Sequence, residues 1–277
     1  MNTVNPLSEA PVESEKTSSS CQSTPLEKRY DDDLENTWGF FSWCEYILTV
    51  IVSSVLLIGA SALTLFWVIY YRDGFAWSEN PKIQFNLHPV FMVIGFITLS
   101  GFSILLYRLC RCLKHIYAKL AHSLFHTLSI PCIAIGFLAV YDSHNLDSPP
   151  KPNFYSLHSW LGMVTMGLFG LQFVIGFFTF LVCLCCNKMT YGCRGALIPV
   201  HASLGLATFL LAIASCLSGL TQKAIWTLGE NYSKFTEEGV VINSLGCVLI
   251  ALAILVSFAI RRSFAPATAK VYVTERI

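Results

Sequence analysis

Six long apolar stretches dominate the chain from Trp38 onward. Each runs for roughly 20 or more residues without Asp, Glu, Lys or Arg, which is long enough for a helix to cross a hydrocarbon core of about 30 Å. The charged residues lie in the connections and at the two ends of the chain. This pattern predicts an all-α fold, a bundle of six transmembrane helices. The predicted spans are 46–71, 87–107, 120–141, 157–183, 197–219 and 239–260.

The two ends of the chain differ in composition from this membrane part. Residues 1–37 are rich in Ser, Pro, Glu and Thr and contain few large apolar side chains, so burial cannot offset the entropy lost on ordering. We expect a disordered acidic tail there, a membrane domain over 38–262 and a C-terminal tail over 263–277. Of all residues 54% are apolar and 13% charged, which argues against a soluble globular protein. Because the chain has no dense basic stripe, nucleic acid is not expected as a partner.

Charge and cysteine positions predict the orientation in the membrane. The connections 108–119 and 184–196 hold six bases and no acid, whereas the three connections on the opposite side hold seven acids and five bases. Positive loops favour the cytosol, so both termini are predicted to be cytosolic. None of the 11 cysteines lies in the three acidic connections, which fits reduced thiols without a disulfide framework. One of these connections contains a glycosylation sequon at Asn231.

Histidines lie inside the predicted spans, where carboxylates, lysine and arginine are absent. Each of the four central spans has a histidine within its first two turns. Because consecutive helices run in opposite directions, His88 and His158 are expected near the non-cytosolic face, and the others near the cytosolic face. Ionisable side chains within a membrane are costly and are functional candidates, although a histidine near a helix end can also lie at the headgroup level. These histidines are His88, His122, His126, His158 and His201.

Paired neutral imidazoles at two depths suit haem iron. Imidazole is a common axial ligand of haem, and bundle cores hold such cofactors, whereas zinc usually takes further ligands, for which no carboxylate or cysteine lies at the matching depth. Two bis-histidine haems fit the count best, with irons on the order of 20 Å apart. Gly162 and Gly205, each four residues after a histidine, leave room for a planar group or for a neighbouring helix. Spacing leaves open whether His122 or His126 is the ligand.

Two other classes of membrane protein also use buried histidines. A secondary transporter would relay protons or bind a divalent metal ion, but the chain lacks an intramembrane carboxylate and broken spans in corresponding halves. A di-iron hydroxylase would need dense histidine clusters on one side, whereas the seven histidines here are divided between the faces. Electron transfer across the bilayer is therefore favoured, with histidine-based proton-coupled or metal-ion transport as the alternative.

Short motifs in order along residues 44–262 resemble the cytochrome b561 family. They are Phe85–Val90 (FNLHPV), Leu105–Arg108 (LLYR), Lys119–His122 (KLAH), Tyr155–Trp160 (YSLHSW) and Pro199–His201 (PVH). The resemblance implies a homodimer embedded in membrane lipid, with two haem b groups per chain that carry electrons from cytosolic ascorbate to ferric iron or monodehydroascorbate. It implies His88 with His158 for the non-cytosolic haem and His122 with His201 for the cytosolic haem, which makes His126 a neighbour.

The resemblance also implies an ascorbate site on the cytosolic face. Family members bind ascorbate through basic residues, and those positions match here at Lys119 and Arg194. Ascorbate is a monoanion, which the basic cytosolic connections attract. Some relatives have a second lysine where this chain has His115, so either the adjacent Lys114 serves or the site is weaker or more dependent on pH. Arg108 and Arg111 lie in the stretch that resembles the family's motif after the second span, and they are expected either to bind substrate or to anchor the helix at the membrane surface.

On the opposite face, the resemblance implies an acceptor site. Tyr155 begins the motif that resembles the family's non-cytosolic substrate motif, and His144 lies where relatives have a histidine in the preceding connection. Both are expected to bind ferric iron or another acceptor. The pattern does not distinguish a secretory vesicle, a lysosomal or endosomal membrane and the plasma membrane, because all three share this topology.

Overall fold

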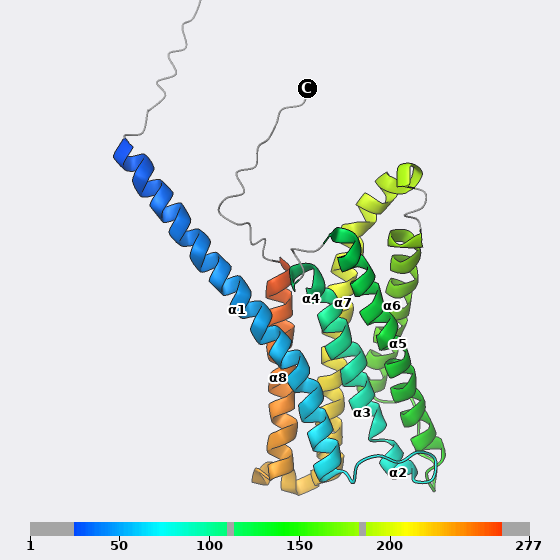
Figure 1. Ribbon diagram of the computed structural model, residues 1–277. Coiled ribbons are helices and arrows are strands. Elements are labelled where there is room, and N and C mark those ends of the chain that lie inside the picture. Colours follow the sequence, from blue (N-terminus) through cyan, green and yellow to red (C-terminus); the bar gives the residue numbers. More distant parts are fainter. Residues whose placement is uncertain (1–24, 110–113, 183–186, 262–277) are drawn as a thin grey trace, which may run out of the picture. The chain divides into compact units, whose positions relative to one another are not determined.

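The computed structural model describes residues 25–109, 114–182 and 187–261, and within these residues it is helical without a β-strand (Figure 1). Residues 1–24 and 263–277 of the predicted tails lie outside the described residues. The elements, in chain order, are α1 (Pro25–Tyr71), α2 (Pro81–Gln84), α3 (Leu87–Met92), the π-helical η1 (Val93–Leu99), α4 (Ser100–Leu109), α5 (His115–Asn145), α6 (Leu157–Phe180), α7 (Asn187–Leu228), the 3-10 segment η3 (Gly229–Lys234) and α8 (Glu237–Arg261).

Six helical stretches of the described chain are long and apolar enough to cross a membrane, which confirms the predicted all-α, six-span fold. The protein is therefore a multi-pass membrane protein. Helix α1 begins at Pro25, so its first turns fall within the range expected to be a disordered tail. The spanning stretches are Phe40–Tyr71, Pro81–Leu109, Ile116–Asn145, Leu157–Phe180, Gly192–Lys234 and Glu237–Arg261.

The second span is one continuous helical path with a π-helical middle, η1. Ser100 Oγ donates to the carbonyl of Gly95, five residues earlier, at 3.0 Å, and Thr98 Oγ1 donates to Leu57 O of α1 at 2.8 Å. A π-turn inserts an extra residue and changes the face that the following turn presents. Both ends of the span thereby face α5: His88 bonds to Gly136 of α5, and Ser103 bonds to His122 of α5.

The described helices pack around an apolar core and expose apolar side chains on their outer faces. Leu57, Ile97 and Leu249 come from α1, η1 and α8 and are fully buried together. By contrast, Leu157 is 72% exposed and Ile254 is 63% exposed. Large apolar side chains on the outside are what a helix needs where its solvent is lipid.

Polar contacts tie the start of α8 to the loop that follows α1. Glu238 accepts a hydrogen bond from Trp67 Nε1 at 2.9 Å and one from Arg72 Nε at 2.7 Å, and it forms an ion pair with Arg72. Asn86 Nδ2 donates to Arg72 O at 2.6 Å and to Gly74 O at 2.9 Å. These bonds hold the loop against the start of α3, two residues before His88.

Candidate functional site

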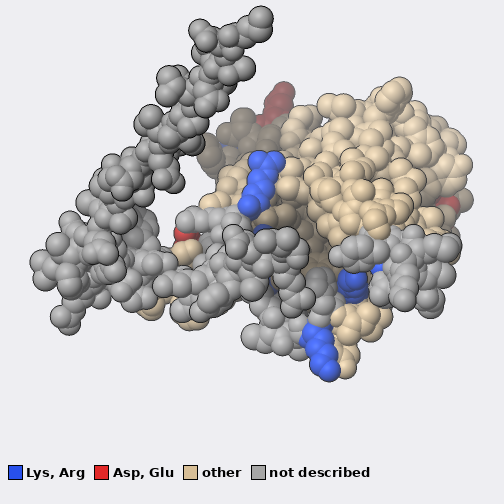
Figure 2. All heavy atoms as spheres, turned by 90° about the horizontal axis from the view of Figure 1, so that it is seen from above, with Lys and Arg blue, Asp and Glu red and all other residues tan. Residues whose placement is uncertain are grey.

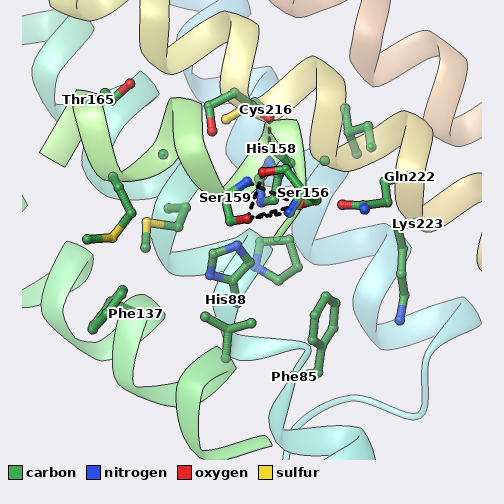
Figure 3. Close-up of a pocket in the computed structure, with 18 of the residues that line it drawn as sticks. Phe85, His88, Phe137, Ser156, His158, Ser159, Thr165, Cys216, Gln222 and Lys223 are labelled. Atoms are coloured by element: carbon green, nitrogen blue, oxygen red, sulfur yellow. Dashed lines mark hydrogen bonds between the residues drawn. The ribbon is translucent and has the colours of Figure 1, made fainter. Parts of the chain in front are cut away.

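Two histidines face each other near one end of the bundle. The ring centres of His88 on α3 and His158 on α6 are 5.9 Å apart, with the ring planes at 86°. Figure 3 shows both histidines in the cavity that they line. His88 Nδ1 lies 3.0 Å from Gly136 O, and His158 Nδ1 lies 2.8 Å from Ser215 O. A carbonyl only accepts, so Nδ1 carries the proton in both rings, and each Nε2 keeps a lone pair that can bind a metal.

A second pair of histidines lies at the other end of the same helices. The ring centres of His122 on α5 and His201 on α7 are 6.2 Å apart. His122 Nδ1 is 2.9 Å from Ser103 O of α4, and Ser103 Oγ donates to the backbone carbonyl of His122 at 2.9 Å. His201 Nδ1 is buried and has no hydrogen-bond partner among the described residues. The Nε2 atom of His122 is therefore free for a ligand, as in the first pair.

Each pair joins two different sets of packed helices. His88 of the second span is hydrogen-bonded to α5, and His122 of the third span is hydrogen-bonded to α4. These two packed spans therefore provide one histidine to the pair at each end of the bundle. His158 on α6 is bonded to α7, which itself provides His201. One histidine of each pair therefore comes from α3 or α5, and the other comes from α6 or α7.

Two glycines make room for the rings on α6 and α7. A Cβ atom at Gly219 would lie 2.7 Å from His158 Cε1, and one at Gly176 would lie 2.8 Å from His201 Cε1. Each glycine faces the histidine of the other helix. The sequence instead singled out Gly162 and Gly205: a Cβ at Gly162 would meet Ser215 Oγ at 3.5 Å, and nothing lies within 4 Å of one at Gly205.

The geometry of both pairs fits two axial ligands of one metal. With a metal–nitrogen bond of about 2 Å, two imidazoles on opposite sides of one ion have ring centres roughly 6 Å apart. The two observed separations, 5.9 Å and 6.2 Å, match this value. Among the described residues no group of three or more His, Cys, Asp or Glu is placed to hold a metal ion. Two imidazoles alone suit a haem iron, because a porphyrin supplies the other four bonds.

His126 lies beside the second pair. Its ring centre is 4.7 Å from that of His122 and 5.6 Å from that of Phe169, and its Nδ1 is buried without a hydrogen-bond partner in the described part of the chain. The contact places His126 one turn along α5 from His122, as their i, i+4 spacing requires.

A cavity of about 170 Å³ opens beside the first pair. It brings together His88 and His158 with the two residues expected in an acceptor site, His144 and Tyr155. His144 Nδ1 is bonded to Asn153 Oδ1 at 3.0 Å, and its ring stacks on Phe85 at 6.4 Å between centres. Tyr155 is 60% exposed.

The sequence did not identify Lys223, which also lines this cavity from α7. In the sequence, Lys223 is only one of five bases in the three acidic connections. A usable signal was its position four residues after Gly219, which places both on one face of a helix. Without the register of α6 against α7, however, that face cannot be assigned to His158.

The residues expected to bind ascorbate lie toward the other end. Lys119 is partly buried on α5, Arg194 is buried on α7, and Lys114 is exposed directly before α5. His115 is the first residue of α5. Figure 2, which shows this end of the molecule from above, has the basic side chains of the described residues at separate places rather than in one patch.

Two further arginines were expected near this site. The Arg108 guanidinium donates to Ile260 O near the end of α8, and Tyr46 donates its hydroxyl to Arg108 O. Arg108 therefore connects the second span to the first and the last. Arg111 lies outside the described residues.

The expected glycosylation site, Asn231, is exposed in η3 between α7 and α8. Its Oδ1 accepts a hydrogen bond from Lys234 Nζ at 3.0 Å. An exposed side chain on a short connection is accessible, as attachment of a glycan requires.

Comparison with known proteins agrees with the resemblance seen in the motifs. Residues 87–227, just over half of the chain, match the eukaryotic cytochrome b561 family. The transmembrane ascorbate-dependent reductase of Ovis aries is 36% identical over 214 residues, covering 77% of this chain and 82% of that protein. The plasma membrane ascorbate-dependent reductase of Xenopus laevis is 36% identical, with 76% and 73% covered. The lysosomal membrane ascorbate-dependent ferrireductase of Danio rerio is 36% identical, with 76% and 86% covered. The chain belongs to the cytochrome b561 family, which implies that it binds haem b.

Proposed function

We propose that this protein is an ascorbate-dependent transmembrane oxidoreductase. It takes electrons from cytosolic ascorbate and delivers them, through two b haems per chain, to ferric iron or monodehydroascorbate on the non-cytosolic side. The observation that carries the proposal is the presence of two histidine pairs at opposite ends of the same four spans, with ring centres 5.9 Å and 6.2 Å apart. The relatives, which are named ascorbate-dependent reductases and a ferrireductase, support it.

In this proposal four histidines hold the two haems. His88 and His158 hold the haem nearer the non-cytosolic face, and His122 and His201 hold the cytosolic one. Bound haem supplies an iron that alternates between the ferric and ferrous states, and thus carries one electron at a time. The backbone carbonyls of Gly136, Ser215 and Ser103 hold the protons of three rings at Nδ1, which leaves the Nε2 lone pair of each ring available to hold an iron.

On the cytosolic face, Lys119 and Arg194 bind the ascorbate monoanion. Lys114 completes the site, or His115 takes that place and makes binding dependent on pH. Opposite charge favours this binding in a cytosolic region whose two connections contain no acid. Arg108 and Arg111 are proposed either to bind substrate or to anchor the second span at the membrane surface, and Arg108 also bonds to the end of α8.

On the other face, the acceptor binds in the cavity beside His88 and His158. His144 and Tyr155 line that cavity from the connection between α5 and α6. An imidazole nitrogen suits a ferric ion, and a phenol donates a hydrogen bond to an organic acceptor. Both residues are thus proposed to position the acceptor rather than to hold the haem.

Orientation and assembly complete the proposal. Both termini lie in the cytosol, Asn231 carries a glycan on the other side, and two chains associate as a homodimer in the lipid bilayer. The membrane is that of a secretory vesicle, a lysosome or endosome, or the plasma membrane; the names of two relatives specify the plasma membrane and the lysosomal membrane.

An optical spectrum tests the central claim. Protein purified after expression with ample haem should be red, and adding ascorbate should produce the sharp bands of reduced low-spin haem, with two haems per chain by quantitative extraction. In vesicles that contain ascorbate, ferric citrate outside should then be reduced. A folded but colourless preparation, or haem that ascorbate leaves oxidised, would contradict the proposal.

A further inference from the structure

Lys223 is the one lysine or arginine that lines the cavity beside His88 and His158 in the described part of the chain. No aspartate or glutamate lines the cavity there either. The Nζ atom of Lys223 lies 4.2 Å from the centre of the Phe85 ring. This is a cation–π contact, which leaves ammonium hydrogens available for hydrogen bonds to a ligand. Figure 3 shows the lysine beside Phe85 at one side of the cavity, with His88 and His158 on the other side of Phe85.

The face of α7 that carries Lys223 is the one that holds the His158 ring. Ser215 accepts the hydrogen bond from His158, and Gly219 gives the ring space. Residues 215, 219 and 223 are spaced by four and lie on one helix face. Lys223 therefore lies one helical turn beyond Gly219, the residue that faces the ring of a proposed haem ligand, and it also lines the cavity.

The neighbouring charges form pairs and leave the lysine uncompensated. Arg72 pairs with Glu238, and Lys151 donates to Asp147 at 2.6 Å. The hydrogen bond from Lys151 keeps the pKa of Asp147 below its usual value, so this carboxyl is ionised at neutral pH and its pair is neutral in sum. No carboxylate within salt-bridge distance of Lys223 is found among the described residues.

We propose that Lys223 binds the anionic group of the electron acceptor. The cavity would accordingly take an acceptor that carries carboxylate or enolate oxygens, either ferric iron in a polycarboxylate chelate or the monodehydroascorbate anion, in preference to a cation. One electron converts the chelated ferric ion to the ferrous ion, and one electron with one proton from water converts monodehydroascorbate to ascorbate. Lys223 takes no part in either transfer; it holds the anion. The inference rests on the proposed function of the cavity as the acceptor site.

Two substitutions at this position separate charge from shape. Lys223→Gln removes the charge but keeps a polar side chain, and Lys223→Arg keeps the charge. Lys234→Gln is the matched control, because Lys234 is an exposed lysine of η3 that bonds to Asn231 and does not line the cavity. Each holoprotein is reconstituted in vesicles loaded with ascorbate, and external reduction is measured with ferric citrate, with monodehydroascorbate and with hexaammineruthenium(III), a cationic acceptor.

Lys223→Gln should raise KM for the anionic acceptors about tenfold or more, since a charged hydrogen bond is lost. It should leave kcat, haem content and reduction by internal ascorbate unchanged, and it should leave the rate with the ruthenium cation equal or higher. Lys223→Arg and Lys234→Gln should behave as wild type. An effect on ferric citrate alone, or on monodehydroascorbate alone, identifies which anion the site accepts.

Equal slowing of all three acceptors, or an unchanged KM for both anions, would overturn this role for Lys223. A failure of the proposed function looks different: haem in the unsubstituted protein would then remain oxidised with ascorbate. In that case reduction of the haem by dithionite before the acceptors are added still tests the lysine, because the three acceptors can be compared without ascorbate.

Discussion

His88 on α3 and His158 on α6 face each other at 5.9 Å between ring centres, and each is bonded to a carbonyl of a further helix, Gly136 O of α5 or Ser215 O of α7. Four helices thus meet at one pair of rings. The orientation of each ring depends on two helices at once, so the spacing that a metal needs is set by helix packing rather than by either histidine alone.

The pairing itself predicts which haem each histidine substitution removes. His88→Ala and His158→Ala should yield similar spectra that lack the non-cytosolic haem, with fast reduction of the other haem by ascorbate. His122→Ala and His201→Ala should share the opposite defect and keep a haem that cytosolic ascorbate reaches slowly. Quantitative haem extraction and optical spectra measure both.

His126→Ala is the control for these substitutions and should keep both haems, with at most a shifted midpoint potential from the lost ring contact with His122. If His126→Ala loses a haem while His122→Ala keeps two, the ligand on α5 is misassigned. A shared phenotype of His88→Ala and His201→Ala would refute the pairing.

Gly219→Ala should perturb the non-cytosolic haem without touching its ligands. The new Cβ would lie 2.7 Å from His158 Cε1, closer than atoms approach, so the ring must move. We expect lower occupancy of that haem or a shifted spectrum, with the cytosolic haem intact. Gly167→Ala on α6 is the control, because nothing lies within 4 Å of a Cβ there. A normal spectrum for Gly219→Ala would show that α7 has room to shift.

Lys119→Ala or Arg194→Ala should weaken binding of ascorbate while leaving haem content unchanged. Losing one charged hydrogen bond costs about 1.5–3 kcal/mol, which corresponds to a rise of roughly 10- to 150-fold in the ascorbate concentration for half-reduction. A titration at constant ionic strength measures it. Lys82→Ala, on the far end of the bundle in α2, should have no effect. Unchanged half-reduction in both cytosolic variants would place the ascorbate site elsewhere.

Glu238→Gln should lower the thermal stability of the bundle. The carboxylate pairs with Arg72 and accepts from Trp67, and the side chains of the ion pair are only 12% and 20% exposed for Glu238 and Arg72. Removing the charge from a partly buried pair costs about 1–3 kcal/mol, and the unfolding midpoint in detergent should fall by a few degrees. Glu230→Gln, at an exposed position of η3, should leave the midpoint unchanged. Equal midpoints for both variants would mean that the pair adds nothing to stability.

The six spans could be predicted from the sequence because the bilayer imposes a length and an apolar composition on each helix separately. The paired depth of the histidines followed from the same constraint, since alternate helices run in opposite directions. The π-helical stretch in the second span could not be predicted in this way. Ser100 bonds to Gly95 within the span, and Thr98 bonds to Leu57 of α1, so the stretch involves a contact with another helix.

The sequence by itself determined that this is a six-span membrane protein with histidines near both faces of its four central helices. Tertiary structure alone decided which atoms surround them: the carbonyls of Gly136, Ser215 and Ser103, the space at Gly176 and Gly219, and the position of Lys223 at the cavity beside His88 and His158. Hydrophobic length is a property of one segment. The rotation and register of one helix against another depend instead on packing between residues far apart in the chain, and no local pattern encodes that relation.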